Sequence, residues 1–184
     1  MNQFQAVAPV LSVGFVVVLV LACTVTDLYN RKIPNCLTLP AVVIGLLIGA
    51  LGGGWKGVFF SGTGIIVGFG LMFLFYYLGA MGAGDVKLMA AVGALLGYPA
   101  IVQVFFYTAI SGGVIAMLVL LRNRLAKQAA RNLFSLVVSF FLLRFSGLKA
   151  QAGEAQLTES VGSIPYGVAI GLGTTAYLCF GRIV

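Results

Sequence analysis

Two aspartates, Asp27 and Asp85, are the only ones in the sequence, and each lies at the end of an apolar run. Carboxylates at the border of a membrane are functional candidates by default, because an ionisable group there is costly to keep. If the two lie close together, repulsion between like charges raises one pKa, so one carboxyl holds a proton while the other stays ionised. Such a pair can activate a water and polarise a peptide carbonyl, which is aspartic-protease chemistry.

Each aspartate also has a purely structural interpretation. Asp85 follows glycines and precedes a helix, so it could be a helix N-cap. Asp27 could pair with Arg31 or Lys32, but an exposed ion pair stabilises little, and the dipole at a helix C-terminus disfavours an anion. The glycines of the segment 82–85 would let backbone or substrate approach the carboxylate. This Gly-Ala-Gly-Asp segment is weak evidence alone and stronger with a second aspartate at the same border.

The composition places these carboxylates in a membrane protein. Of the 184 residues, 61% are hydrophobic and 8% are charged, whereas about 25% are charged in a typical soluble domain. A soluble chain of this size could not hide so much apolar surface from water. Lipid permits only helix bundles or closed barrels, and the apolar runs are long and do not alternate. The sequence therefore predicts an all-α, polytopic transmembrane bundle forming one membrane-embedded domain over residues 1–184.

The apolar runs predict about six spanning helices, since a span needs about 20 residues. Glycines 52–54 separate two of these helices. Residues 86–121 would be too long for one span, and Gly97-Tyr98-Pro99 is a good break. Residues 133–145 are interpreted as an interfacial helix in preference to a span. The expected helices cover residues 10–26, 37–51, 58–78, 86–97, 100–121 and 164–180.

Four pairs of glycines four residues apart predict close helix packing. They are Gly45 with Gly49, Gly64 with Gly68, Gly93 with Gly97, and Gly167 with Gly171.

The net charge of +7 is interpreted as topology and not as nucleic-acid binding. Counting helices from the N-terminus puts Asp27, Asp85 and the basic segment 122–131 at the same membrane face, with Lys56 at the other. An excess of Lys and Arg marks a cytoplasmic face. The aspartates are therefore expected at the cytoplasmic side of the cytoplasmic (inner) membrane.

No cofactor or metal is expected. Cys23, Cys36 and Cys179 are scattered, no CxxC pair exists, and the sequence has no histidine, so a zinc or haem site is disfavoured. The cysteines are interpreted as small buried residues. The N-terminus carries no basic side chain, so the first run is interpreted as a retained helix and not as a signal peptide.

Three blocks of the sequence resemble the type IV prepilin peptidases, in the family's order. They are DLYNRKIPNCLTLP at residues 27–40, GAGDVKLMAAVGALLG at 82–97 and IPYGVAI at 164–170. The resemblance implies an aspartic endopeptidase that cuts the short basic leader from prepilins and pseudopilins at the cytoplasmic membrane face. Asp27 and Asp85 would be the catalytic pair, and the supporting residues would be Gly82, Gly84, Lys87, Pro165, Tyr166 and Gly167.

The sequence departs from the long, bifunctional members of that family. Those members carry an N-terminal domain with paired CxxC motifs, associated with methylation of the new pilin N-terminus. Without such a motif here, we expect cleavage without N-methylation, and the short form resembles the peptidases of tight-adherence (Flp) pilus systems. Lys87 could instead be a snorkelling interfacial lysine, and Glu154 and Glu159 are interpreted as solvated loop charges in preference to a site for a basic leader.

Three other interpretations stay open from the residues. One is another GxGD protease of the presenilin or signal-peptide-peptidase type, but Thr26 precedes Asp27 where those have tyrosine, and their Pro-Ala-Leu motif is absent. A transporter or channel could use the aspartates as an ion site, although internal repeats are not evident. A membrane scaffold without enzymatic activity is the third. The expected partners are prepilin substrates and the lipid bilayer.

Overall fold

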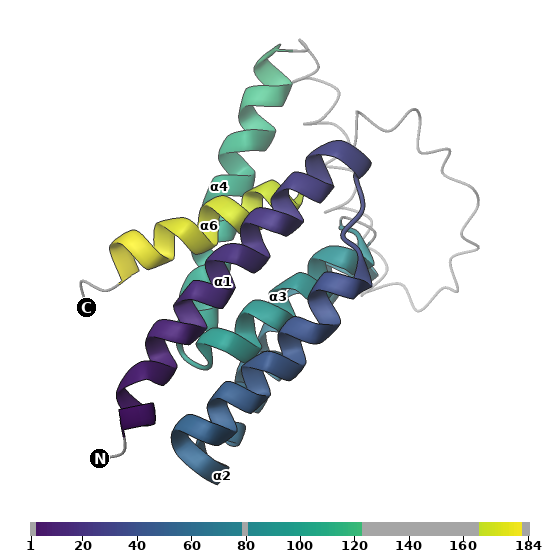
Figure 1. The fold of residues 1–184 in the computed structure, drawn as a ribbon. Coiled ribbons are helices and arrows are strands. Elements are labelled where there is room, and N and C mark those ends of the chain that lie inside the picture. Colours follow the sequence, from purple (N-terminus) through teal and green to yellow (C-terminus); the bar gives the residue numbers. More distant parts are fainter. Residues whose placement is uncertain (1–2, 79–80, 123–165, 182–184) are drawn as a thin grey trace, which may run out of the picture. The chain divides into compact units, whose positions relative to one another are not determined.

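The computed structural model describes residues 3–78, 81–122 and 166–181, and the regular elements in these ranges are helices (Figure 1). The described residues belong to two units, one containing residues 3–113 and 166–181 and the other containing residues 114–122. The predicted all-α class is confirmed for this part of the chain. The helices are α1 (Gln3–Asn30), α2 (Asn35–Tyr77), α3 (Ala83–Leu96), α4 (Ala100–Arg122) and α6 (Tyr166–Phe180).

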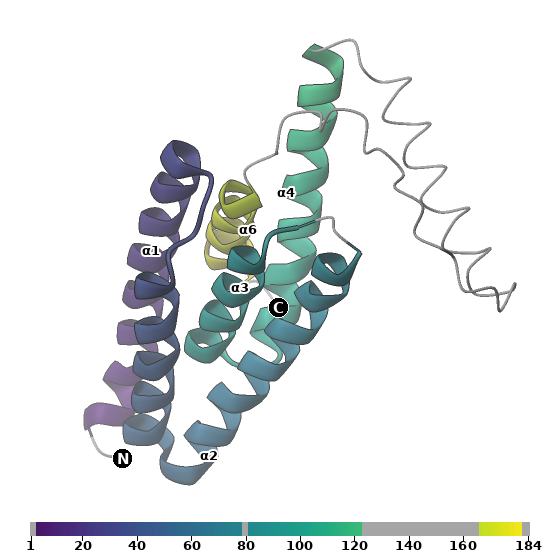
Figure 2. The same cartoon turned by 90° about the vertical axis from the view of Figure 1, so that its right-hand side faces the viewer.

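Helix α2 contains the break that the three consecutive glycines predict. Gly54 has φ 57° and ψ −136° inside the helix, a conformation that a residue without Cβ adopts readily, and α2 reverses direction (Figure 2). The backbones of Gly49 and Gly57 touch across the turn, and the Ser61 hydroxyl donates a hydrogen bond of 3.2 Å to the Gly45 carbonyl. The helix is therefore two antiparallel arms, each about 20 residues long, the length of a span.

Within the part of the chain that the structure describes, three helical segments are long and apolar enough to cross a membrane: Ala8–Asn30, Asn35–Tyr77 and Ala100–Val119. The shorter helix α6 is also apolar. The expected break between the fourth and fifth runs is confirmed, because α3 ends at Leu96 and α4 begins at Ala100. The count of about six spans stays a prediction, and the segment 133–145 lies outside the described residues.

Helix α1 continues further than the sequence predicts. It runs through Asp27 to Asn30, so the aspartate lies in the last helical turn, near the C-terminal end of the helix as expected. The N–H of Arg31 still donates to the Asp27 carbonyl at 2.9 Å, and Arg31 itself has φ 51°. A residue in this left-handed conformation commonly ends a helix.

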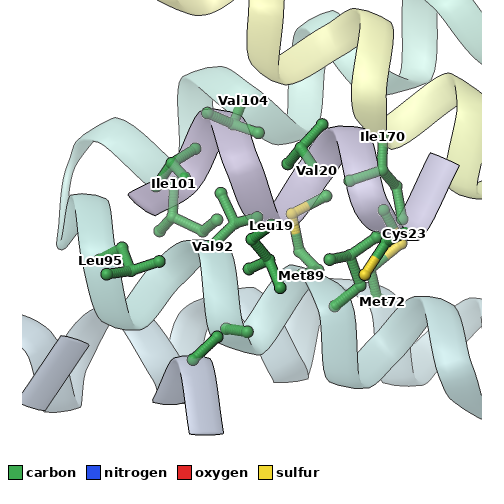
Figure 3. Packing of buried hydrophobic residues seen from close by; sticks show 14 of the residues in the cluster. Leu19, Val20, Cys23, Met72, Met89, Val92, Leu95, Ile101, Val104 and Ile170 are labelled. Atoms are coloured by element: carbon green, nitrogen blue, oxygen red, sulfur yellow. The ribbon is translucent and has the colours of Figure 1, made fainter. Parts of the chain in front are cut away.

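Helix α3 forms the centre of the packed core. Its residues from Asp85 to Leu95 are buried apart from Lys87, and it contacts α1, α2 and α6. Figure 3 shows Met89, Val92 and Leu95 of α3 among side chains from the surrounding helices. Large apolar side chains on the outer faces of these helices, such as Ile66, are exposed, as expected where lipid is the solvent. This packing fixes the position of the N-terminus of α3, where Asp85 lies.

The four predicted glycine pairs all lie where elements approach closely. The closest contacts are Gly45 with Ala94, Gly49 with Gly57 and Ser61, Gly64 with Gly93, Gly68 with Met89, Gly97 with Phe60, Gly167 with Asp27, and Gly171 with Thr24. The interpretation of these spacings as packing signals is confirmed.

Substitution of Gly64 by alanine should destabilise the protein by about 3 kcal/mol, because the added methyl overpacks a tight contact. The Cβ would collide with the backbone carbonyl of Gly93, which cannot rotate away. Gly62→Ala is the matched control, since nothing lies within 4 Å of its Cβ, and it should leave stability unchanged or raise it slightly. Thermal unfolding in detergent measures both, and equal unfolding temperatures would show that the Gly64 contact is not tight.

Candidate active site

The two aspartates line one cleft. The cleft has a volume of about 270 Å³ and is formed by the end of α1, the connection to α2 and the start of α3. Asp27 is 6% exposed and Asp85 is 8% exposed. Helices from different parts of the chain thus bring the predicted carboxylates to the same place. The lining residues are Asp27, Arg31, Lys32, Ile33, Gly82, Ala83, Gly84 and Asp85.

Helix α6 holds the Asp27 carboxylate. The N–H of Gly167 donates a hydrogen bond of 2.8 Å to Asp27 Oδ2, and the Thr24 hydroxyl donates one of 3.3 Å to the Gly167 carbonyl. Gly167 lies in the first turn of α6, where N–H groups lack helical partners and the dipole favours an anion. The first turn of α6 therefore offsets the unfavourable position of Asp27 near the C-terminus of α1.

Asp85 is held by its own helix start. Gly82 is the N-cap of α3 and Asp85 is three residues further on, so the aspartate is not itself the N-cap. The N–H of Gly82 donates to Asp85 Oδ2 at 3.1 Å. Burial raises the pKa of Asp85 from 3.8 to about 6, the Gly82 hydrogen bond opposes this rise, and the negative charge of Asp27 adds to it. The two carboxyls thus have different surroundings, and burial favours the protonated form of Asp85.

The stability of the folded chain should fall as the pH rises through about 6, the folded-state pKa of Asp85. A carboxyl whose pKa is raised by folding contributes stability that is complete below its ordinary pKa and is lost above its folded one. The full effect is about 2–3 kcal/mol. Thermal unfolding in detergent at about pH 4 and pH 7 measures it, and Asp85→Asn should reduce the difference. An Asp85→Asn chain with the unchanged pH dependence would contradict this assignment.

The predicted supporting residues have different surroundings. Gly84 packs against the connection that follows α1, because a Cβ there would lie 3.0 Å from Ile33 Cβ. A Cβ at Gly82 would make only an ordinary contact with Asp85 Oδ2, at 3.5 Å. Gly82 therefore contributes to the site through its backbone N–H, which Asp85 accepts. Tyr166 is half-buried at the start of α6, next to the bound Gly167. Pro165 lies outside the described residues.

Lys87 has a specific partner that the sequence does not reveal. Its Nζ donates a hydrogen bond of 2.9 Å to Asn35 Oδ1, at the start of α2. Arg31 and Lys32 were predicted only as topological charges or ion-pair partners, although both line the cleft. Their position four and five residues after Asp27, in the first resembling block, was the available signal.

The comparisons with known proteins give one family match and several partial relatives. The model of the type IV leader peptidase family matches residues 14–117, a range that contains both aspartates. A prepilin leader peptidase/N-methyltransferase of Aeromonas salmonicida (strain A449) is 38% identical over 109 residues, which are 55% of this chain and 38% of that protein. One from Burkholderia pseudomallei (strain K96243) is 30% identical over 112 residues, with 57% and 36% covered.

A third relative with the same description, from Bacillus subtilis (strain 168), is 29% identical over 113 residues, with 60% of this chain and 45% of the relative covered. This chain therefore covers less than half the length of these three relatives. No solved structure matches the chain significantly.

Proposed function

The chain belongs to the type IV leader peptidase family, and we propose that it is an aspartic endopeptidase that removes the leader peptide from prepilins and pseudopilins. The observation that carries this proposal is the single cleft lined by two buried carboxylates. Both carboxylates fall inside the matched range 14–117. The relatives named as prepilin leader peptidases support the substrate class.

The surroundings of the two carboxyls suggest separate roles for them. We assign Asp27 the role of general base, and its Oδ2 accepts the Gly167 N–H at the start of α6. Asp85 carries the shared proton, since burial raises its pKa to about 6. Asp27 takes a proton from the attacking water as general base, while Asp85 donates its proton to the oxygen of the scissile carbonyl. The tetrahedral intermediate then collapses when the leaving amine receives a proton from the pair.

The finer parts of the proposal concern the membrane and the product. We place about six spans in one domain over residues 1–184, in the cytoplasmic membrane, with the aspartates at the cytoplasmic side. The basic residues Arg31 and Lys32 beside the cleft support that side. We further propose that cleavage occurs without N-methylation, which the reaction described next tests. Prepilins of the tight-adherence (Flp) type are the proposed substrates.

A reconstituted reaction tests this function. The purified chain is incubated in liposomes with a purified Flp-type prepilin and the methyl donor S-adenosylmethionine, and the products are measured by mass spectrometry. We expect a free leader peptide and a mature pilin whose N-terminus is not methylated. The Asp27→Asn, Asp85→Asn double variant is the control. A prepilin that stays intact with the wild-type chain would contradict the peptidase, and a methylated product would contradict only the finer proposal.

A further inference from the structure

Two contacts join the start of α3 to the connection between α1 and α2. Lys87 Nζ donates to Asn35 Oδ1 at 2.9 Å, and Gly84 lies against Ile33, where an added Cβ would be 3.0 Å from the Ile33 side chain. The residues of α3 that make these contacts lie on either side of Asp85 in the sequence. The connection between α1 and α2 therefore contacts α3 directly beside Asp85, whose carboxyl lines the same cleft.

The connection itself has no regular secondary structure. Residues 31–34 lie between α1, which ends at Asn30, and α2, which begins at Asn35. Arg31, Lys32 and Ile33 nevertheless form one wall of the cleft. The Arg31 N–H donates to the Asp27 carbonyl at the start of this wall, and Ile33 packs against Gly84 further along it.

We propose that Lys87 and Asn35 are positioning residues, whose hydrogen bond holds the wall formed by residues 31–34 against α3 and so fixes the geometry of the two catalytic carboxyls. This inference rests on the proposed function of the cleft. Both side chains are exposed, and neither lines the cleft. They therefore act through the wall and not on the reacting atoms.

The competing role for Lys87 is direct contact with the substrate, and the two roles predict different kinetics. Removing either side chain breaks the same hydrogen bond. Lys87→Met and Asn35→Leu should therefore lower kcat by a similar factor and leave KM nearly unchanged. A substrate contact would make Lys87→Met raise KM, while Asn35→Leu would have little effect.

Rates of leader cleavage by the two single variants and the double variant test the pair. Each single variant should lose about threefold to tenfold in kcat, the range expected for the loss of one ordinary hydrogen bond. The double variant should lose no more than the worse single variant, because both remove the same interaction. Asn35→Asp should retain activity, since a carboxylate also accepts a hydrogen bond from the lysine. Independent, additive losses, or a raised KM in Lys87→Met alone, would overturn the proposal.

Hydrogen exchange gives a measurement that does not require activity. Loss of the Lys87–Asn35 bond should speed amide exchange over residues 31–37 by a similar factor in both single variants. Lys56→Met is the matched control, because it removes an exposed lysine that does not line the cleft, and it should leave this exchange unchanged. Unchanged exchange in both single variants would contradict the proposal that this bond holds the wall, even if cleavage occurs. A wild-type chain without cleavage would instead contradict the proposed function while the exchange result still stands.

Discussion

Replacement of Asp85 by asparagine should lower the rate of leader cleavage by about 10³-fold or more, and Asp27→Asn should do the same. Asparagine keeps the size of the side chain and can still accept the backbone hydrogen bonds from Gly82 and Gly167. It cannot donate an acidic proton or accept one from water. The variants therefore remove proton transfer while leaving the cleft intact, and initial rates with a purified prepilin measure the loss.

Asn30→Ala is the control for these variants. Asn30 is exposed in the last turn of α1 and does not line the cleft, so its loss should leave the rate nearly unchanged. Circular dichroism should show that all three variants keep their helices. Either aspartate variant cleaving at the wild-type rate would exclude that residue from catalysis. An ion flux that disappears in both variants, with no cleavage at any stage, would indicate a transport site instead.

Gly167→Ala should lower kcat by about 10²-fold, the cost of misplacing a catalytic group by about 1 Å. The new Cβ would lie 2.7 Å from Asp27 Oδ2 and 2.9 Å from Asp27 Cβ, so either the carboxylate or the start of α6 must move. Either shift disturbs the 2.8 Å hydrogen bond from Gly167. Single-turnover cleavage with saturating enzyme isolates the effect on the chemical step.

Gly112→Ala provides a matched comparison at another contact of α6. Its Cβ would meet Ala169 at 3.5 Å and Tyr166 at 3.9 Å, which are ordinary van der Waals distances, so cleavage should stay near the wild-type rate. Equal rates for the Gly167 and Gly112 variants, both folded, would show that the start of α6 does not position Asp27.

The sequence predicted those parts of the fold that depend on local patterns. Apolar runs and glycine clusters located the turn at Gly54 and the break before Ala100. The spacing of glycines such as Gly64 and Gly68 identified helix faces that pack closely, although it could not identify the partner of each face. The end of α1 was misplaced, because the polar residues from Asp27 to Asn30 lower hydropathy without breaking a helix.

The candidate site was predicted through its motifs, and its internal contacts were not. The two aspartates followed from residue type and from helix parity, and both line the cleft. The Gly167–Asp27 bond joins residues 140 positions apart, and the Lys87–Asn35 bond joins residues 52 positions apart. Contacts over such separations depend on how whole helices pack, which local periodicity does not record.

The hydrogen bond from Gly167 to Asp27 also determines at what stage of its synthesis the protein could become active. A growing chain has made both carboxyls by residue 85, but it lacks the donor at position 167. Until that donor arrives, Asp27 lies near the C-terminus of α1 without the opposing helix start, in a field that disfavours its charge. Nascent chains still attached to the ribosome should therefore be inert toward their substrate until α6 has left the ribosome and docked.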